Sequence, residues 1–577
     1  MWLAPHNQAW LEEFRSKHDR APRVLHIGNI ANNAYLNAKF LRSVGVESDV
    51  LCGDYYHIMG CPEWEEALID GHFGSPDQPQ WHRAELNGFV RPDWFVQGPM
   101  DICLDYLNAR NSGRTRKARI LWERLGIANG TRSGSLDIVK RRGSIWRRIK
   151  RLMWVLMFEQ PAPGTYRSAN AGDERLQLVA QPMATRAAPR SVVNEHRSLW
   201  RRTKGLTGLL MLSRWAINGV TGRALGIFRQ LRGRCFQIVR LLLGIPLRFI
   251  GKVFFSNRAS LLSLSDASVY LPLVQKCGRV FRHYDLVQGY ATDGVYPMLS
   301  GHKYVAYEHG TIRDIPFQDT VQGRLCALTY RLADAVVITN ADNVDAAKKL
   351  GLQRYVFVPH PVNDIRVDAF DSDQLRVALR EGLGADFLVF HPARQHWEAR
   401  RHPSWEKGND FFIKAFARFV KTTNPKAGAV FVEWGQSVEQ SKELLTSMGV
   451  ADRVKWIAPQ SHRRMLAYIT ACDVVADQFF LGAFGTTMPK ALMCGRPALI
   501  YLNAEMHRWC FPQAPPVVNV RTSEEIFEGL CRLHGETAYR TSIQELGTEW
   551  YWRWHSSDRV MNMLLEVYRQ VLGNRSG

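Results

Sequence analysis

The stretch RVLHIGNIANNAYLNAKFLRSVGVESDVLC, residues 23–52, decides the fold of the first part of the chain. Residues 23–28 are an apolar run that ends in glycine, as a buried strand does, and a small polar turn follows. Residues 35–44 then have helical spacing, Gly45 can end that helix, and residues 46–52 form another apolar strand. A strand, a helix and a second strand in this order form a βαβ unit, which implies a parallel sheet.

Short apolar strands that end in polar residues or glycine return later in the chain. They read YDLVQGY, KYVAYEHG, ADAVVITN and YVFVPHP in one group, and DFLVFHPARQ, AVFVEWG, RVKWIAP, CDVVADQ and PALIYLN in a second group. We therefore expect an α/β protein with two Rossmann-like, doubly wound domains. Ligands bind at the carboxyl ends of the strands in such sheets, so candidate site residues are sought there.

The net charge of +21 is concentrated in one part of the chain. Between Arg110 and Arg258 there are 31 lysines and arginines but only 6 aspartates and glutamates. We interpret this part as a basic, largely helical insert in the first domain. The expected organisation is a first domain at 1–109 and 259–365, the insert at 110–258, a second domain at 366–545 and a C-terminal helix at 546–577.

Several classes of site are not expected. The ten cysteines form no C-x-x-C pair and no Cys/His cluster with zinc spacing. The D-x-D triplet at 371–373 falls in a linker and is interpreted as solvated, so we expect no metal and no cofactor. GNIANNA lacks the G-x-G-x-x-G pattern, which argues against a nicotinamide cofactor.

The pattern at the N-terminus and the length of the apolar runs bear on location. MWLAPHNQAWLEEF has no basic region followed by an apolar run, as a signal peptide would have. No apolar run reaches the roughly 18 residues of a spanning helix. We expect a cytoplasmic protein, either soluble or peripheral at the inner face of the membrane.

Two motifs lie in the second domain in a fixed order. Arg394 follows the strand DFLVFHP, and KGND at 407–410 comes after the long spacer QHWEARRHPSWE. GAFGTTMPKALMCGRP at 482–497 comes later, after the strand CDVVA. These motifs resemble those of GT-B glycosyltransferases, and are similar to glycosyltransferase family four, whose retaining enzymes use nucleotide-sugars. The matching residues are Arg394, Lys407, Gly408, Asp410, Phe484, Gly485, Ala491, Gly495 and Pro497.

The resemblance implies roles for the two cations. Transfer of a sugar from a nucleoside diphosphate builds negative charge on the leaving phosphates, and Arg394 and Lys407 would stabilise that charge. Arginine grips phosphate as a planar fork, whereas lysine acts as a point charge. The alternative is a solvated basic loop, because Arg400 and Arg401 lie nearby in the sequence.

The second motif departs from the family at two positions. Gly482 and Lys490 stand where the family has glutamates, so the sugar and ribose contacts of those glutamates do not carry over. Small residues at a helix start let a phosphate approach backbone N–H groups, although a tight packing turn would look the same. Lys490 has either a phosphate or carboxylate nearby, or faces solvent. The candidates here for donor binding are Gly482, Phe484, Gly485, Thr486 and Lys490.

Other polar residues at strand ends are further candidates. Asp477, Gln478 and Glu433 follow two strands of the second domain and are predicted to form a polar wall around the donor. His309 in YEHGTIRD ends a strand of the first domain, where the resemblance implies that it faces the reacting sugar. The candidates for acceptor binding in the first domain are Gly28, Asn29, Asn32, Asn33, Tyr290 and Asp293.

The insert mixes basic, aromatic and aliphatic side chains. SIWRRIKRLMWVLMF is one such segment, and a second one, from LTGLLML to GKVFF, has no acidic residue. Helices of this kind lie in the interface of an anionic bilayer. Nucleic acid also attracts lysine and arginine, but its grooves do not favour the aliphatic runs, so we expect no nucleic-acid partner. A lid helix that packs on the protein is a third interpretation.

Together these patterns predict a glycosyltransferase at the membrane surface. It would move a sugar from a nucleoside-diphosphate donor, as co-substrate, to a lipid-linked or cell-envelope polysaccharide acceptor. The missing glutamates motivate an alternative, a catalytically silent GT-B module that binds membrane or glycan as a scaffold.

Overall fold

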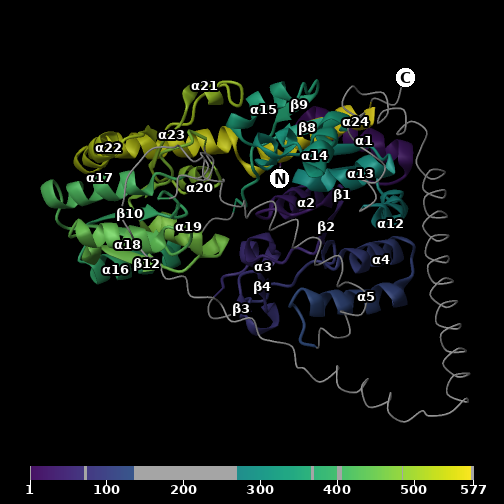
Figure 1. Ribbon diagram of the computed structural model, residues 1–577, viewed down its shortest axis with the longest axis horizontal. Helices are drawn as coiled ribbons and strands as arrows, with labels where there is room; N and C mark the ends of the chain where they lie inside the picture. The colour runs from purple at the N-terminus through teal and green to yellow at the C-terminus, as the bar shows by residue number, and fades with distance from the viewer. Residues whose placement is uncertain are drawn as a thin grey trace, which may run out of the picture. The chain divides into compact units, whose positions relative to one another are not determined.

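The computed structural model describes residues 2–69, 74–134, 270–364, 369–398, 406–483 and 485–573. Two parallel sheets organise these residues (Figure 1). They confirm the expected pair of doubly wound domains. The amphipathic helices expected between 135 and 258 lie outside the described residues, as does Phe484.

The first sheet has seven strands, and all neighbouring strands are parallel. Their spatial order is β5 (Phe95–Gly98), β2 (Glu47–Gly53), β1 (Arg23–Ile27), β6 (Leu286–Tyr290), β7 (Tyr304–Tyr307), β8 (Ala335–Ile338) and β9 (Tyr355–Phe357). The predicted βαβ unit is β1, α2 and β2. Gly45, at φ +83°, follows the end of α2, as the sequence predicts.

Helices cover both faces of the first sheet. One face packs against α4 (Met100–Asn111), α5 (Thr115–Ala128), α12 (Leu271–Phe281), α13 (Val295–Ser300), α14 (Val321–Leu332) and α15 (Val344–Lys349). The other face packs against α1 (Pro5–His18), α2 (Asn33–Ser43) and α24 (Ser557–Gly573). Strand residues alternate between the two cores, since Leu25 and Ile27 point to one and Val24 to the other.

The last helix of the chain belongs to the first sheet's core. Asn562 of α24 accepts hydrogen bonds from the Ala4 backbone N–H at 2.8 Å and from Asn7 Nδ2 at 3.0 Å. The Tyr568 hydroxyl donates to Gln288 Oε1 at 2.7 Å. Figure 1 shows α24, in yellow, beside the purple α1. The chain therefore returns from the second sheet to the first at its end.

The second sheet has six parallel strands. Their order is β12 (Val454–Ile457), β11 (Ala427–Val432), β10 (Phe387–His391), β13 (Val474–Ala476), β14 (Ala498–Ile500) and β15 (Val518–Asn519). One core includes side chains of α16 (Ala369–Leu383), α19 (His462–Ala471), α20 (Thr487–Met493) and α23 (Thr537–Trp554). The opposite core includes α17 (Asn409–Thr422), α18 (Val438–Ser447) and α22 (Ser523–Gly535), and α21 (Ala504–His507) follows β14.

Helix α5 lies in the range that the sequence analysis gave to the basic insert. It packs Leu121 and Leu125 into the first sheet's core, next to α4. Its other side is basic and exposed. Among the residues that the structure describes, no helix is both long and apolar enough to cross a membrane.

The loop after β2 contains a short helix, α3 (Pro62–Glu66), and a two-stranded hairpin of β3 (Gly74–Ser75) and β4 (Gln78–Pro79). Glu63 of α3 is almost fully buried and accepts two hydrogen bonds from Arg91, from Nε at 2.8 Å and from Nη2 at 2.7 Å. This bidentate ion pair fixes α3, because a buried charge without its partner is strongly unfavourable.

We predict that Arg91→Ala lowers the free energy of unfolding by about 3–5 kcal/mol, because it leaves the Glu63 carboxylate buried and uncompensated. Urea unfolding followed by circular dichroism measures this change. The exposed Arg83 nearby is the control, and Arg83→Ala should change stability by less than about 0.5 kcal/mol. Equal effects of the two variants would contradict the assignment.

Candidate active site

Lys407 lies where three segments of the second domain meet. Its backbone N–H donates to the His396 carbonyl at 3.0 Å, and its carbonyl accepts from the Phe479 N–H at 2.8 Å. Gly408 follows at φ +67°, and a Cβ atom there would lie 3.2 Å from Phe479 Cβ. The backbone of Lys407 is thus fixed between the loop after β10 and the loop after β13.

The Lys407 side chain is held by a residue that the sequence also singled out. Its Nζ donates to Gln478 Oε1 at 2.8 Å, and Gln478 Nε2 donates to the Ala483 carbonyl. The Tyr501 N–H donates to the Gln478 carbonyl at 2.9 Å, which ties this strand end to the end of β14. One amide side chain therefore connects Lys407 to the glycine-containing turn before α20.

Asp477 and Lys407 influence each other's pKa. Burial lowers the pKa of Lys407 to about 8, and the Asp477 carboxylate opposes this shift while Arg394 adds to it. Burial raises the pKa of Asp477 to about 6, and Lys407 opposes that shift. Near neutral pH both groups are therefore mainly ionised.

Arg394 contributes a second cation near Lys407. Its guanidinium lies 6.0 Å from the centre of the Trp434 ring, and burial lowers its pKa. Its Nε is buried and has no hydrogen-bond partner among the described residues. No carboxylate in the described part of the chain forms an ion pair within 4 Å of Arg394 or Lys407. Two cations without a directly bound counter-ion fit an anionic ligand.

The loop EHGTIRD of the first domain is built around a buried carboxylate. Glu308 is fully buried and accepts hydrogen bonds from the Gly310 N–H and from Asn343 Nδ2. Burial raises its pKa to about 7. Arg313 of this loop donates from Nε and Nη2 to Asp342, at 2.5 and 2.9 Å.

The charges of this first-domain loop influence the pKa of Lys407 in the second domain. The charges of Arg313 and Asp342 both act on Lys407, where Arg313 lowers its pKa and Asp342 raises it. The sequence analysis did not single out Arg313 or Asp342. Their position after β7 and β8, at carboxyl ends of the first sheet, was the signal that pointed to them.

His309 is predicted from the sequence and has a suitable environment in the structure. Its ring lies 5.5 Å from the ring of His360 and 5.4 Å from that of Tyr307. Burial moves its pKa well below the usual value, so the imidazole is neutral. Its Nε2 is buried without a hydrogen-bond partner among the described residues. A neutral imidazole with an unused nitrogen can donate to, or accept from, a ligand hydroxyl.

The predicted acceptor residues serve mainly to build the loop after β1. Asn29 is 2% exposed, and its carbonyl oxygen accepts from the backbone N–H groups of Ala34 and Tyr35. Asn32 donates to the Cys61 carbonyl at 2.9 Å. The Asn33 amide oxygen lies 3.1 Å from His360 Nδ1. These amide side chains hold the start of α2 through hydrogen bonds within the chain, so they are not available to bind an acceptor.

The structure also corrects the prediction that Tyr290 contacts an acceptor. The residue is fully buried, and its hydroxyl is within hydrogen-bond distance of His26, Asn37 and Gln288. The last residue of β6 points into the core, so Tyr290 supports the sheet and does not reach a ligand. Asp293 and Gly28 do come together, since a Cβ atom at Gly28 would lie 2.5 Å from Asp293 Oδ2.

Glu433 has a partner within this chain. Its side chain is 42% exposed and forms an ion pair with Lys442 of α18 at 2.6 Å. Its place in the polar wall stays a prediction, and Trp434, the next residue, contacts Arg394.

Gly482 has a structural reason to lack a side chain. It has φ +82°, and a Cβ atom would lie 2.9 Å from Tyr501 Cε1 and 3.0 Å from Asn503 Cβ. A glutamate at this position would need a different backbone conformation, and the side chains of Tyr501 and Asn503 would have to move. Gly485 has open space around it, and Thr486 precedes α20 without a side-chain capping bond. Burial lowers the pKa of Lys490, and the charge of Glu65 opposes this shift.

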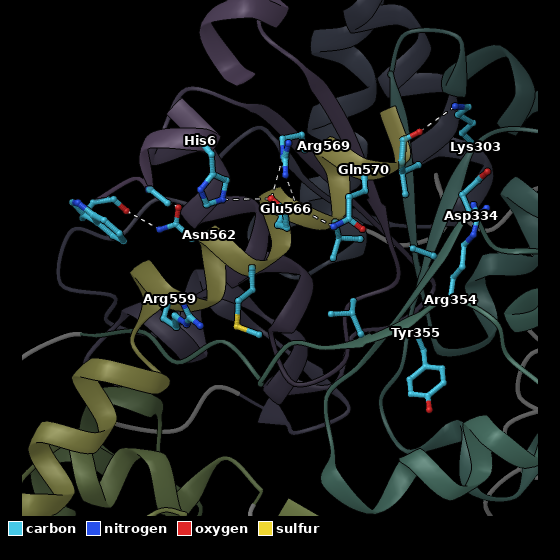
Figure 2. Close-up of a pocket in the computed structure, with 17 residues that line it drawn as sticks. His6, Lys303, Asp334, Arg354, Tyr355, Arg559, Asn562, Glu566, Arg569 and Gln570 are labelled. Atoms are coloured by element: carbon cyan, nitrogen blue, oxygen red, sulfur yellow. Dashed lines mark hydrogen bonds and ion pairs between the residues drawn. The ribbon is translucent and has the colours of Figure 1, made fainter. Parts of the chain in front are cut away.

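A large pocket lies elsewhere and contains none of the predicted site residues. Its volume is about 1220 Å³, and Figure 2 shows its lining from α24, the N-terminal segment and the β8–β9 edge. Lys303, Asp334 and Arg354 line it before the starts of β7, β8 and β9. It therefore belongs to the amino end of the first sheet. No cluster of potential metal ligands occurs among the described residues.

Comparison with known proteins supports the interpretation of the motifs. Residues 402–508 match the family described as Glycosyl transferases group 1. The matched segment contains Lys407, Asp477, Gln478 and the turn before α20. This match agrees with the resemblance to glycosyltransferases that the motifs predict, within the matched part of the second domain. No curated protein matches the sequence significantly.

Several solved structures of other proteins are similar to this chain over about half of its length. HepE (Alr3699) of Anabaena, in complex with UDP and glucose, is 17% identical with a TM-score of 0.44, over 53% of this chain and 84% of that chain. Sucrose-phosphate synthase of Thermosynechococcus elongatus is 15% identical with a TM-score of 0.41, over 52% and 79%. WaaG, a glycosyltransferase involved in lipopolysaccharide biosynthesis, is 14% identical with a TM-score of 0.38, over 56% and 85%.

We predict that Lys407 titrates with a midpoint near pH 8, which pH-dependent acetylation read by mass spectrometry measures. Asp477→Asn removes the carboxylate that opposes the shift, so the midpoint should move lower. Glu433→Gln, which changes a carboxylate at the surface, should leave the midpoint in place. A midpoint above pH 10 in the unmodified protein would refute the burial of this ammonium group.

Proposed function

We propose that the protein transfers a sugar from a nucleoside-diphosphate donor to a lipid-linked or cell-envelope glycan acceptor. The observation that carries the proposal is the pair Arg394 and Lys407, two partly buried cations without a directly bound carboxylate among the described residues. The family match at residues 402–508 supports the same chemistry. The nucleotide-sugar is a co-substrate, and no cofactor or metal is needed for this role.

The two cations would act on the leaving diphosphate. As the bond to the sugar breaks, negative charge grows on the phosphate oxygens, and fixed positive charges stabilise that state more than the ground state. Arg394 can present two N–H groups to two oxygens, whereas Lys407 adds a point charge positioned by Gln478.

Two further side chains would hold the sugar. The Asp477 carboxylate can accept hydrogen bonds from sugar hydroxyls, in place of the glutamate that Gly482 lacks. His309, neutral and with an unused Nε2, would bind a hydroxyl from the first domain. Retention of configuration follows from the resemblance to family four and is part of the proposal.

We predict that Arg394→Ala and Lys407→Ala each lower transfer, or donor hydrolysis, by about 100-fold or more, because each removes a charge that stabilises the leaving group. The assay screens a panel of nucleotide-sugars by release of the nucleotide. Lys414→Ala is the matched control, since Lys414 is 48% exposed on α17 and pairs with Asp410.

Two results would overturn the proposal. Unchanged turnover in both variants would remove the two cations from the chemistry. If calorimetry detects no nucleotide-sugar bound at millimolar concentration, the alternative of a silent scaffold is favoured instead.

We also infer that the basic segment places the protein on an anionic membrane, as a peripheral protein at the inner face. The described start of this segment supports it, because α5 exposes Arg116, Lys117 and Arg124 around a hollow of about 540 Å³. Ile120 lies among them and is 42% exposed. Basic and aliphatic groups on one face suit the interface of an anionic bilayer.

We predict that the full chain sediments with vesicles of mixed phosphatidylcholine and phosphatidylglycerol, and that Arg116→Glu with Lys117→Glu weakens this binding at least about tenfold. Arg508 is exposed and directly follows α21 in the second domain. Arg508→Glu reverses its charge and should have little effect on vesicle binding. Stronger binding to duplex DNA than to the vesicles at matched salt would refute the membrane partner.

A further inference from the structure

Three arginine side chains gather at the end of α19, at the amino end of the second sheet. Helix α19 packs against both α16 and α20. Arg376 and Arg380 lie four residues apart on α16, so they share one face of that helix. Arg496 follows the end of α20 and comes two residues before β14. We call these three residues the arginine cluster.

The position of Arg496 is set by the way α20 ends. The Arg496 N–H donates to the Ala491 carbonyl at 2.9 Å, and the Gly495 N–H donates to the Leu492 carbonyl at 3.0 Å. With Gly495 at φ +63°, these two bonds form the helix end known as the Schellman motif. The motif therefore fixes the backbone from which the Arg496 side chain extends.

Two guanidinium groups of the cluster share one acceptor. Arg376 Nη2 and Arg496 Nη2 each donate to the Thr470 carbonyl oxygen at 2.7 Å. Because both bonds end on one oxygen, the two guanidinium groups lie side by side. Arg380 Nη2 adds a third cation, 3.4 Å from each oxygen of the Asp473 carboxylate. Thr470 lies in the last turn of α19, whose free carbonyls attract positive charge.

The cluster holds more positive charge than its neighbours compensate. Among the described residues, Asp473 is the carboxylate that forms an ion pair with the cluster, and it pairs with Arg380. Asp473 Oδ2 also accepts a hydrogen bond from the Leu388 N–H at 2.8 Å, so this carboxylate is shared with the backbone. At the end of α22, by comparison, Arg540 Nη1 donates to the Leu533 carbonyl at 2.8 Å. Capping a helix end therefore does not account for three arginines.

The arginines also carry unused hydrogen-bond donors. The Nε atoms of all three are buried and have no hydrogen-bond partner among the described residues. Burial lowers the pKa of Arg496, Arg376 lowers it further, and Asp473 raises it by less. Unpaired buried donors and adjacent like charges both cost free energy, which a bound anion would offset. The Arg380 side chain is 40% exposed, so an anion can reach the cluster from solvent.

Guanidinium chemistry favours a phosphate group as that anion. Each guanidinium presents its N–H groups as a planar fork that matches two oxygens of a phosphate or a carboxylate. A carboxylate has only two oxygens, and one fork occupies both of them. A phosphate ion or phosphate monoester has further free oxygens, so it can accept from several guanidinium groups at once.

We propose that Arg376, Arg380 and Arg496 form a second anion site, which binds a phosphate group at the amino end of the second sheet. Asp473 comes directly before β13, whereas Asp477 and Gln478 of the candidate active site come directly after it. The two sites therefore lie at opposite ends of the same strand. This inference does not rest on the proposed function.

The first test is calorimetric titration with inorganic phosphate, with acetate at matched ionic strength as the control anion. It uses the unmodified protein and Lys407→Met, in which phosphate binding at the candidate active site is weakened. In both backgrounds, Arg376→Gln with Arg496→Gln should weaken phosphate binding at least about tenfold, because two of the three forks are removed. Acetate should bind more weakly than phosphate.

Two further variants show whether the effect comes from the site. Arg540→Gln removes an arginine from another helix end and should change phosphate affinity by less than twofold. Arg380→Lys keeps the charge but loses the fork, so it should weaken phosphate binding while circular dichroism shows an unchanged fold. Phosphate should raise the Tm of the unmodified protein, and the double arginine variant should lose this shift.

Two results would overturn the proposal. One is the absence of phosphate binding to the unmodified protein at about 10 mM phosphate. The other is equal phosphate affinity in the double arginine variant and in its parent. If the unmodified protein binds no nucleotide-sugar, the proposed function fails, but the phosphate titrations still decide whether the arginine cluster is a site.

Vesicles identify the source of the phosphate group, since a free ion and a lipid headgroup present the same chemistry. Phosphatidic acid in phosphatidylcholine offers a phosphate monoester at the vesicle surface. Weaker sedimentation of the double arginine variant with these vesicles, relative to the unmodified protein, would assign the site to the headgroup. Equal sedimentation, together with lost binding of inorganic phosphate, would assign it to a soluble phosphate. Either result supports the site.

Discussion

The hydrogen bond from Lys407 Nζ to Gln478 Oε1 is the interaction on which the candidate site depends. It joins the segment before α17 to the loop after β13, and Gln478 passes the connection on to the turn before α20. Because the Gln478 amide makes both contacts, the position of the Lys407 ammonium group is coupled to the conformation of the turn before α20. The loops of three parallel strands are thereby brought to one edge of the second sheet.

In the proposed site, the first domain contributes a loop with little freedom. The buried Glu308 carboxylate accepts from backbone and side-chain N–H groups, and this fixes the residues that carry His309 and Arg313. Arg313 is in turn held by Asp342. Polar groups that are satisfied inside a protein give well-defined positions, whereas His309 Nε2 remains unused among the described residues and so suits a ligand.

The sequence predicted the sheets well because buried strands and their polar ends have a strong local pattern. The sequence also singled out Arg394, Lys407, Asp477 and Gln478, since all four follow strands or belong to the motif; their roles stay predictions, and the structure joins Lys407 to Gln478 by a hydrogen bond. Tyr290 is the last residue of a strand and Glu433 follows one, but the pattern does not say whether a strand-end side chain points into the core or toward solvent. Gly482 could not be explained from sequence, because its crowding comes from Tyr501 and Asn503 in the segment after β14. The charge that opposes the burial shift of the Lys490 pKa is that of Glu65, which the sequence places far away in the other domain.

The central claim is that Lys407, charged below about pH 8, binds the donor diphosphate together with Arg394. The most direct measurement is calorimetric titration of the protein with nucleoside diphosphates between pH 7 and pH 9.5. An anion favours the protonated lysine, so the affinity should be flat below about pH 8 and fall above it, and Lys407→Met should remove this fall. Binding that does not depend on pH in the unmodified protein, or no binding of any nucleoside diphosphate, would contradict the claim.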